Sequence, residues 1–174
     1  EPQARVYLHV VENARDQRRS GRGETLSLLG QLRSVSLHPY LKADDMSDEQ
    51  YINASARLKC LFDQLDRVAA AREKALVFVE SLEMQSVLQS LIQRRYRLPS
   101  RPLMINGELA GAKRKQRADQ FQSGDGFDVM ILSPRAGGVG LTLTAANHVF
   151  HLSRWWNPAV EDQCSDRVYR IGQT

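Results

Sequence analysis

Cysteine, histidine and long apolar runs are scarce in this sequence. Its 174 residues include two cysteines, Cys60 and Cys164, which form no CxxC pair, and four histidines that show no ligand spacing with them. A disulfide framework or a metal site is therefore not expected. Apolar runs such as residues 75–79 are too short to cross a bilayer. No charged-then-apolar signal segment opens the chain, so we expect a cytosolic-type location.

Several enzyme motifs are also missing. No GxxxxGKS or GxxxxGKT segment is present, so the chain has no P-loop to cradle nucleotide phosphates. No acidic box follows an apolar strand to hold magnesium, because Asp48 and Glu49 lie in a polar stretch. Local motifs suggest no Ser–His–Asp or Cys–His arrangement. Local motifs therefore give this chain no complete catalytic site of its own.

The composition suits one compact domain. Hydrophobic residues make up 42% of the chain, and 24 Lys+Arg against 20 Asp+Glu give a net charge of +4. This small excess indicates a polyanionic partner only weakly. For the basic clusters, a solvated helix face is the default interpretation and contact with a phosphate backbone the alternative. These clusters are Arg94, Arg95, Arg97 and Arg101, and Lys113, Arg114, Lys115 and Arg117.

The first part of the chain, residues 1–46, is predicted to be a helical appendage. Apolar residues recur at helical spacing over residues 6–14 and 26–35. The second helix should end at His38, because the residue before a proline avoids the α region. Arginines and glycines over residues 15–23 indicate an exposed turn. The polar acidic residues 44–49 are interpreted as a solvated linker.

From residue 47 onward, helices alternate with short apolar strands. We expect helices capped by Ser55 and Ser81, a basic helix after Gly107, and a last helix after Pro158. Strands are expected over residues 75–80, 102–106, 128–133 and 147–152. The alternation predicts an α/β fold with a parallel sheet flanked by helices. Ligands gather at the carboxyl ends of such strands, so the segments after Glu80, Asn106, Ser133 and Leu152 are candidate sites.

Two segments at this expected edge carry chemistry. Residues 133–144 place three glycines and several hydroxyls after a strand, which lets a phosphate approach backbone N–H groups. A tight turn packed for steric reasons is the alternative. Four polar residues of the last segment share one helix face: Gln163, Asp166, Arg167 and Arg170. The two arginines could clamp a phosphate chain, or form an exposed Asp–Arg pair of little energetic weight.

These segments resemble the C-terminal lobe of Swi/Snf-type helicase-like ATPases, which belong to helicase superfamily two. The resemblance rests on residues 132–149, 155–163 and 166–174, and on the shorter elements 3–7, 32–41 and 55–58. It implies a RecA-like lobe over residues 47–174, truncated at its C-terminal end. It also implies an N-terminal RecA-like lobe of the same protein that binds most of the ATP and Mg²⁺, with double-stranded DNA across both lobes.

The same resemblance implies roles for particular residues. Arg167 and Arg170 would be arginine fingers that neutralise charge on the transferred γ-phosphoryl group. Gly138, Gln163 and Asp166 would serve nucleotide binding. Contacts to the DNA backbone would come from Ser133, Arg135, Gly137, Gly140 and Thr142. Two departures affect the expected DNA path: Pro134 replaces a usual threonine and removes one N–H, and Glu108 adds a negative charge.

The predicted function is the second motor lobe of an ATP-dependent translocase on double-stranded DNA, which hydrolyses ATP only within the full-length protein. The alternative is a non-catalytic DNA- or protein-binding module derived from a helicase lobe. A phosphate-ligand α/β enzyme is a weaker third interpretation. The expected location is the cytoplasm or nucleoid of a bacterium or archaeon, or the nucleus of a eukaryote.

Overall fold

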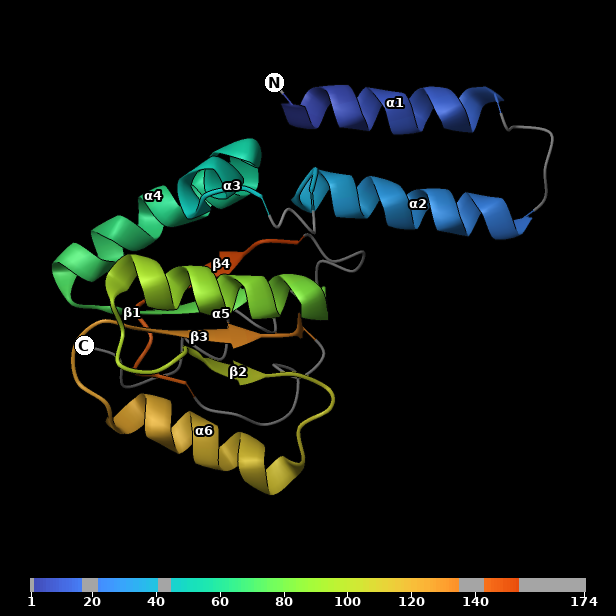
Figure 1. The fold of residues 1–174 in the computed structure, drawn as a ribbon. Coiled ribbons are helices and arrows are strands. Elements are labelled where there is room, and N and C mark those ends of the chain that lie inside the picture. Colours follow the sequence, from blue (N-terminus) through green and yellow to red (C-terminus); the bar gives the residue numbers. More distant parts are fainter. Residues whose placement is uncertain (1, 17–21, 41–44, 135–142, 154–174) are drawn as a thin grey trace. The chain divides into compact units, whose positions relative to one another are not determined.

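A computed structural model describes residues 2–16, 22–40, 45–134 and 143–153 (Figure 1). The chain forms two compact units, Glu1–Phe62 and Asp63–Thr174. The expected division into an appendage of residues 1–46 and a lobe of residues 47–174 stays a prediction. Within the described ranges, every helix is too short or too polar to span a bilayer.

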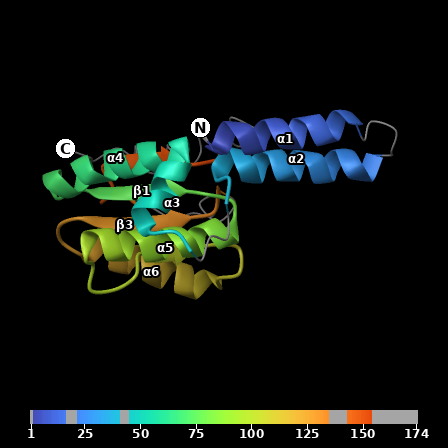
Figure 2. The same ribbon diagram turned by 45° about the horizontal axis from the view of Figure 1, so that its top comes forward.

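The first unit is helical, as expected. Helices α1 (Pro2–Asp16) and α2 (Arg22–Leu37) lie side by side in both Figure 1 and Figure 2. Helix α2 ends directly before His38, which confirms the effect of the proline. The turn expected over residues 15–23 is wrong at both ends, because Arg15 belongs to α1 and Arg22 begins α2. Residues 17–21 lie outside the described residues.

The polar stretch before residue 50 forms the start of a helix, so its interpretation as a linker is wrong from Ser47 onward. Helix α3 (Asp48–Ala54) begins with a capping box. The Ser47 Oγ accepts a hydrogen bond from the Gln50 N–H at 3.2 Å, and the Gln50 Oε1 accepts one from the Ser47 N–H at 3.0 Å. Asp48 and Glu49 occupy the first turn, where the helix dipole favours acidic residues. Residues 41–44 lie outside the described residues.

The second unit contains a parallel four-stranded sheet in the order β2-β3-β1-β4. Its strands are β1 (Lys74–Phe78), β2 (Leu103–Ile105), β3 (Asp128–Leu132) and β4 (His148–His151). All strand pairs are parallel, so the four expected strands and the parallel sheet are confirmed. The central strands β1 and β3 are buried at nearly every position, as strands covered on both faces should be.

Helices α5 (Leu82–Tyr96) and α6 (Gly111–Ser123) connect the strands. The chain passes from β1 through α5 outward to β2, and from β2 through α6 back to β3. Right-handed crossovers in opposite directions place the two helices on opposite faces of the sheet. On the α6 face, Phe121 packs with Leu76, Phe78 and Met130 in the hydrophobic core.

The expected serine caps are present. The Leu58 N–H donates to the Ser55 Oγ at 3.3 Å, at the start of helix α4 (Ala56–Ala71). The Met84 N–H donates to the Ser81 Oγ at 3.2 Å, at the start of α5. Both bonds satisfy backbone donors of a first helical turn. The helix expected after Pro158 lies outside the described residues.

Candidate functional site

The carboxyl ends of the four strands meet at one edge of the sheet. Backbone hydrogen bonds continue the strand pairing past the last strand residues: Val79 N–H to Leu132 O at 3.0 Å, Ser133 N–H to Ile105 O at 3.0 Å, and Leu152 N–H to Phe78 O at 2.9 Å. The ends of the four strands from which the candidate segments start therefore lie at the same edge, whereas residues 135–142 and 154–174 lie outside the described residues.

Ser133 is the predicted site residue that the described part contains. It follows β3 directly and is 9% exposed. Its backbone N–H donates to the Ile105 carbonyl at 3.0 Å. That donor is used within the sheet, so a contact between Ser133 and DNA would come from other atoms of the residue. Its role in DNA binding stays a prediction.

The other predicted site residues lie outside the described residues: Arg135, Gly137, Gly138, Gly140, Thr142, Gln163, Asp166, Arg167 and Arg170. The two ends of segment 135–142 are nevertheless well defined. Pro134 is buried before it, and Leu143 and Ala146 are buried in the core after it. The Gln122 side chain fixes the second end, because its Oε1 accepts a hydrogen bond from the Ala145 N–H at 2.7 Å.

The turn after β2 is shaped by its own polar groups. The Asn106 Oδ1 accepts a hydrogen bond from the Glu108 N–H at 3.1 Å, which forms an Asx-type turn. The Arg114 Nε donates to the Leu109 carbonyl at 2.7 Å, and its guanidinium also reaches the Gly107 carbonyl at 3.3 Å. Arg114 therefore holds the turn in place, which favours a structural role for this arginine over phosphate contact.

The remaining basic side chains of α6 have different surroundings. Arg117 donates to the Met104 carbonyl and so ties α6 to β2. Lys113 and Lys115 are exposed. Helix α6 begins after Ala110, which makes no side-chain cap hydrogen bond, so the N-cap residue leaves the first N–H groups of the helix unsatisfied. An uncapped helix N-terminus beside lysines favours anions, and it lies at the carboxyl edge of the sheet.

Sequence reasoning missed Gln85 on α5. This residue is fully buried, and its Nε2 donates to the Val79 carbonyl at 2.8 Å, just beyond β1. Its Oε1 has no hydrogen-bond partner among the described residues. The signal in the sequence is a glutamine three residues before Leu88, on the buried stripe of α5. Gln85 thus braces the backbone at the candidate edge.

Side chains that commonly bind metal ions do not form a cluster in the described part of the chain. No group of three or more His, Cys, Asp or Glu side chains is placed to hold one within the described ranges. The described residues thus provide no clustered set of ligands for Mg²⁺.

Comparisons with known proteins agree with this architecture. The model of the helicase conserved C-terminal domain family matches residues 56–172. The putative ATP-dependent helicase/translocase YwqA of Bacillus subtilis is 36% identical over 176 residues, which cover 98% of this chain and 19% of that protein. The chain thus spans about a fifth of the length of this curated relative.

Two solved structures resemble the chain closely. The SWI2/SNF2 ATPase core of Sulfolobus solfataricus in complex with double-stranded DNA has a TM-score of 0.80 at 29% identity, and the match covers 99% of this chain and 36% of that one. The C-terminal part of the Fun30 ATPase domain has a TM-score of 0.82 at 19% identity, over 99% of this chain and 78% of that one. The latter likeness shows the fold alone.

The expected RecA-like fold and the resemblance seen in the motifs are both confirmed. The family match includes the whole sheet and its candidate edge. The chain belongs to the helicase conserved C-terminal domain family, as a C-terminal lobe of the Snf2 type.

Proposed function

We propose that this chain is the second motor lobe of an ATP-dependent translocase on double-stranded DNA. The observation that carries the proposal is the family match over residues 56–172, which includes every predicted site residue. Two similar proteins support it: YwqA, which is named a putative ATP-dependent helicase/translocase, and the Sulfolobus core, whose structure is a complex with double-stranded DNA. The proposed location follows from the DNA: the cytoplasm or nucleoid of a bacterium or archaeon, or the nucleus of a eukaryote.

The proposed nucleotide side of the lobe includes Arg167 and Arg170 as arginine fingers. A guanidinium is always charged and forks onto phosphate oxygens, so it can neutralise charge on the γ-phosphoryl group during transfer. Gly138, Gln163 and Asp166 are proposed to line or position this site. The N-terminal RecA-like lobe of the same protein would bind most of the ATP and Mg²⁺. This chain alone is therefore proposed to be inactive as an ATP hydrolase.

The proposed DNA side lies along the segment after β3. Its residues are Ser133, Arg135, Gly137, Gly140 and Thr142. The exposed lysines Lys113 and Lys115, beside the uncapped start of α6, add positive charge to the same edge of the sheet. Contacts of this kind neutralise backbone phosphates and do not read base sequence. The lobe would therefore track the duplex irrespective of its sequence.

Substitution of the fingers in the full-length protein tests the proposal. Arg167→Ala and Arg170→Ala should each lower DNA-stimulated ATP hydrolysis by about a thousandfold, the order that an arginine finger supplies. Binding of a fluorescent ATP analogue should persist, because the first lobe holds most of the nucleotide. Arg101→Ala is the matched control, since this exposed arginine follows α5 and precedes β2. Wild-type turnover in both finger variants would refute the assignment.

The non-catalytic alternative makes a different prediction. A degenerate lobe that only docks DNA or protein would leave ATP hydrolysis by the full-length protein undetectable at every DNA concentration. The presence of a P-loop upstream of this chain in the full-length sequence separates the two proposals directly.

A further inference from the structure

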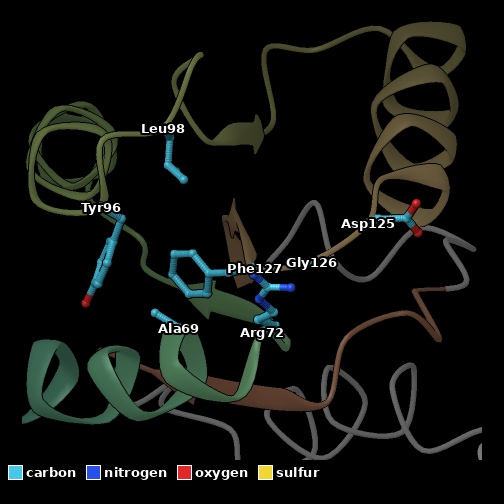
Figure 3. Close-up of a pocket in the computed structure, with 7 residues that line it drawn as sticks. All are labelled: Ala69, Arg72, Tyr96, Leu98, Asp125, Gly126 and Phe127. Atoms are coloured by element: carbon cyan, nitrogen blue, oxygen red, sulfur yellow. The ribbon is translucent and has the colours of Figure 1, made fainter.

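A cavity of about 550 Å³ opens at the opposite edge of the sheet, where the strands begin (Figure 3). Tyr96, Leu98 and Phe127 supply its larger apolar groups, and Arg72, Asp125 and Gly126 its polar rim. Arg72 lies between the end of α4 and the start of β1, and residues 125–127 directly precede β3. Five-residue strands separate this edge from the carboxyl edge by roughly 15 Å. The cavity is therefore distinct from the candidate nucleotide and DNA edge.

The backbone around the cavity is unusual. The described part has three residues at positive φ: Arg72 at 57°, Arg97 at 51° and Gly126 at 79°. Arg72 and Gly126 line the cavity, and Arg97 lies between the lining residues Tyr96 and Leu98. Glycine adopts positive φ without steric cost because it lacks a Cβ, whereas any residue with a Cβ is strained there. At the two arginines, the positive φ belongs to the ends of helices α4 and α5.

The two arginines occupy matching positions. At the end of α4, the Arg72 N–H donates to Ala69 O at 3.1 Å and the Glu73 N–H to Val68 O at 3.0 Å. At the end of α5, the equivalent bonds run from Arg97 to Arg94 O at 3.4 Å and from Leu98 to Gln93 O at 3.1 Å. Both are Schellman motifs, in which glycine is the usual residue. An arginine at position 72 thus keeps a backbone strain that glycine would remove.

The aromatic wall of the cavity is held rigidly. The Tyr96 hydroxyl donates to the Asp66 Oδ1 at 2.8 Å, and Arg95 binds both oxygens of the same carboxylate at 2.9 and 2.6 Å. These Arg95 bonds hold the pKa of Asp66 below its ordinary value, and burial raises the pKa of Tyr96. The Tyr96 ring meets Phe127 at a centroid distance of 4.8 Å and a tilt of 60°.

The two charged side chains at the rim, Arg72 and Asp125, have no ion-pair partner among the described residues. The Arg72 guanidinium and the Asp125 carboxylate are exposed, and neither forms a side-chain hydrogen bond or ion pair with a described residue. In Figure 3, the Asp125 carboxylate lies well apart from the Arg72 guanidinium, although both residues line the cavity. A carboxylate at the rim disfavours a phosphate backbone as the occupant. A polypeptide with one apolar side chain and a carboxylate matches both the wall and Arg72.

We propose that this cavity is a docking site for a segment of a partner protein. The segment inserts one apolar side chain against Tyr96, Leu98 and Phe127, and it sets an acidic residue against Arg72. Tyrosine and arginine dominate the energetics of protein interfaces, and a wall that is already rigid loses little entropy on binding. The proposal does not rest on the proposed motor function, because the cavity lies at the other edge of the sheet.

Fluorescence anisotropy with the full-length protein tests the proposal. The probe is a short labelled peptide with one phenylalanine flanked by glutamates, and its counterpart has lysines in place of the glutamates. Arg72→Gly removes the guanidinium and relieves the strained backbone, so the fold is retained. We expect the glutamate peptide to bind about fivefold more weakly to this variant. Arg97→Gly is the matched control, with the same backbone motif and charge change, and its affinity should stay within about twofold of wild type.

Three results would overturn the docking proposal. They are the absence of measurable binding of the glutamate peptide to the wild-type protein, an equal loss of affinity in the two glycine variants, and equal affinity for the lysine peptide. Thermal melting of both variants verifies that they fold. The finger substitutions at Arg167 and Arg170 leave this assay unchanged, so failure of the motor proposal and failure of the docking proposal are distinguishable.

Discussion

The carbonyl groups at the end of α2 receive hydrogen bonds from two side chains that are distant in sequence. The Gln3 Nε2 donates to Val35 O at 2.9 Å and Ser36 O at 3.1 Å, and the Ser55 Oγ donates to Leu37 O at 2.7 Å. The Gln3 Oε1 also accepts from the Ala56 N–H at 3.1 Å. Helix ends need such partners. The short elements 3–7, 32–41 and 55–58 therefore meet at one junction within the first unit.

Replacement of Gln3 tests this junction. Gln3→Ala removes three hydrogen bonds at once and leaves backbone groups at two helix ends without their side-chain partner. We expect the free energy of unfolding to fall by about 1–3 kcal/mol. Urea denaturation followed by circular dichroism measures the change. Gln31→Ala, at an exposed position of α2, is the control and should change stability by less than about 0.5 kcal/mol. Equal effects of the two substitutions would contradict the role of Gln3.

His38 has a defined tautomer at the same junction. The Tyr40 N–H donates to its Nδ1 at 2.9 Å, so Nδ1 carries no proton, and Nε2–H donates to Tyr51 O at 2.9 Å. His38 is 1% exposed, and its ring stacks on the Tyr51 ring with the two ring centroids 3.8 Å apart. Burial lowers the pKa of His38 from its ordinary value of 6.5, although its two backbone partners act in the opposite direction. The native state therefore favours the neutral ring.

This lowered pKa predicts the direction of a pH effect. Below the unfolded-state pKa, the unfolded chain binds a proton at this position that the native state resists, so stability is full above about pH 6.5 and falls as the pH drops. We expect a smaller loss of stability between about pH 7.5 and 5.5 in His38→Gln than in the wild type. His9→Gln, at an exposed position, should keep the wild-type slope. Parallel slopes for all three proteins would exclude His38 as a source of the pH dependence.

At the scale of secondary-structure elements, Lys74 of strand β1 caps the C-terminus of helix α6. The Lys74 Nζ donates to the carbonyls of Phe121 and Gly124 and lies 5.1 Å from the centre of the Phe121 ring. Lys74 is only 6% exposed, at the first position of β1. A cation satisfies the last carbonyls of a helix and complements its negative end. This contact joins β1 to α6 across the edge where the strands begin.

Loss of this contact should weaken the second unit. Lys74→Met keeps much of the apolar volume but leaves two carbonyls without their donor, so we expect the free energy of unfolding to fall by about 1–3 kcal/mol. Lys115→Met removes the same charge from an exposed position of α6 and serves as the control. Chemical denaturation of both variants measures the difference. A Lys74→Met protein as stable as its control would show that the cation contributes nothing to the end of α6.

For the whole molecule, periodicity predicted the sheet because each strand is a buried apolar run, and turn residues mark its ends. The sequence contains the Ser47 and Gln50 of the capping box, but the acidic residues beside them favoured the interpretation as a linker. The burial of Lys74 was not predictable, because it depends on carbonyl groups far along the chain. The place of Gln85 on the buried stripe of α5 could be read from the sequence, but its partner, the Val79 carbonyl, could not. The charged residues that line the cavity, Arg72 and Asp125, resemble ordinary surface residues in sequence. Periodicity therefore finds elements, whereas the partners of buried polar groups require the fold.

The proposed DNA track of the full-length protein predicts a strong dependence on salt. Each lysine that neutralises a phosphate releases condensed counterions, so the logarithm of affinity falls linearly with the logarithm of salt concentration. Replacement of both Lys113 and Lys115 by glutamine should lower this slope by about 1–2 units on double-stranded DNA. Arg114 and Arg117 are engaged with backbone carbonyls, so the paired change isolates the exposed lysines of α6. Lys59→Gln, at an exposed position of α4 in the first unit, is the control and should keep the wild-type slope. An unchanged slope in the double variant would remove α6 from the track and confine the proposed DNA contacts to the segment after β3.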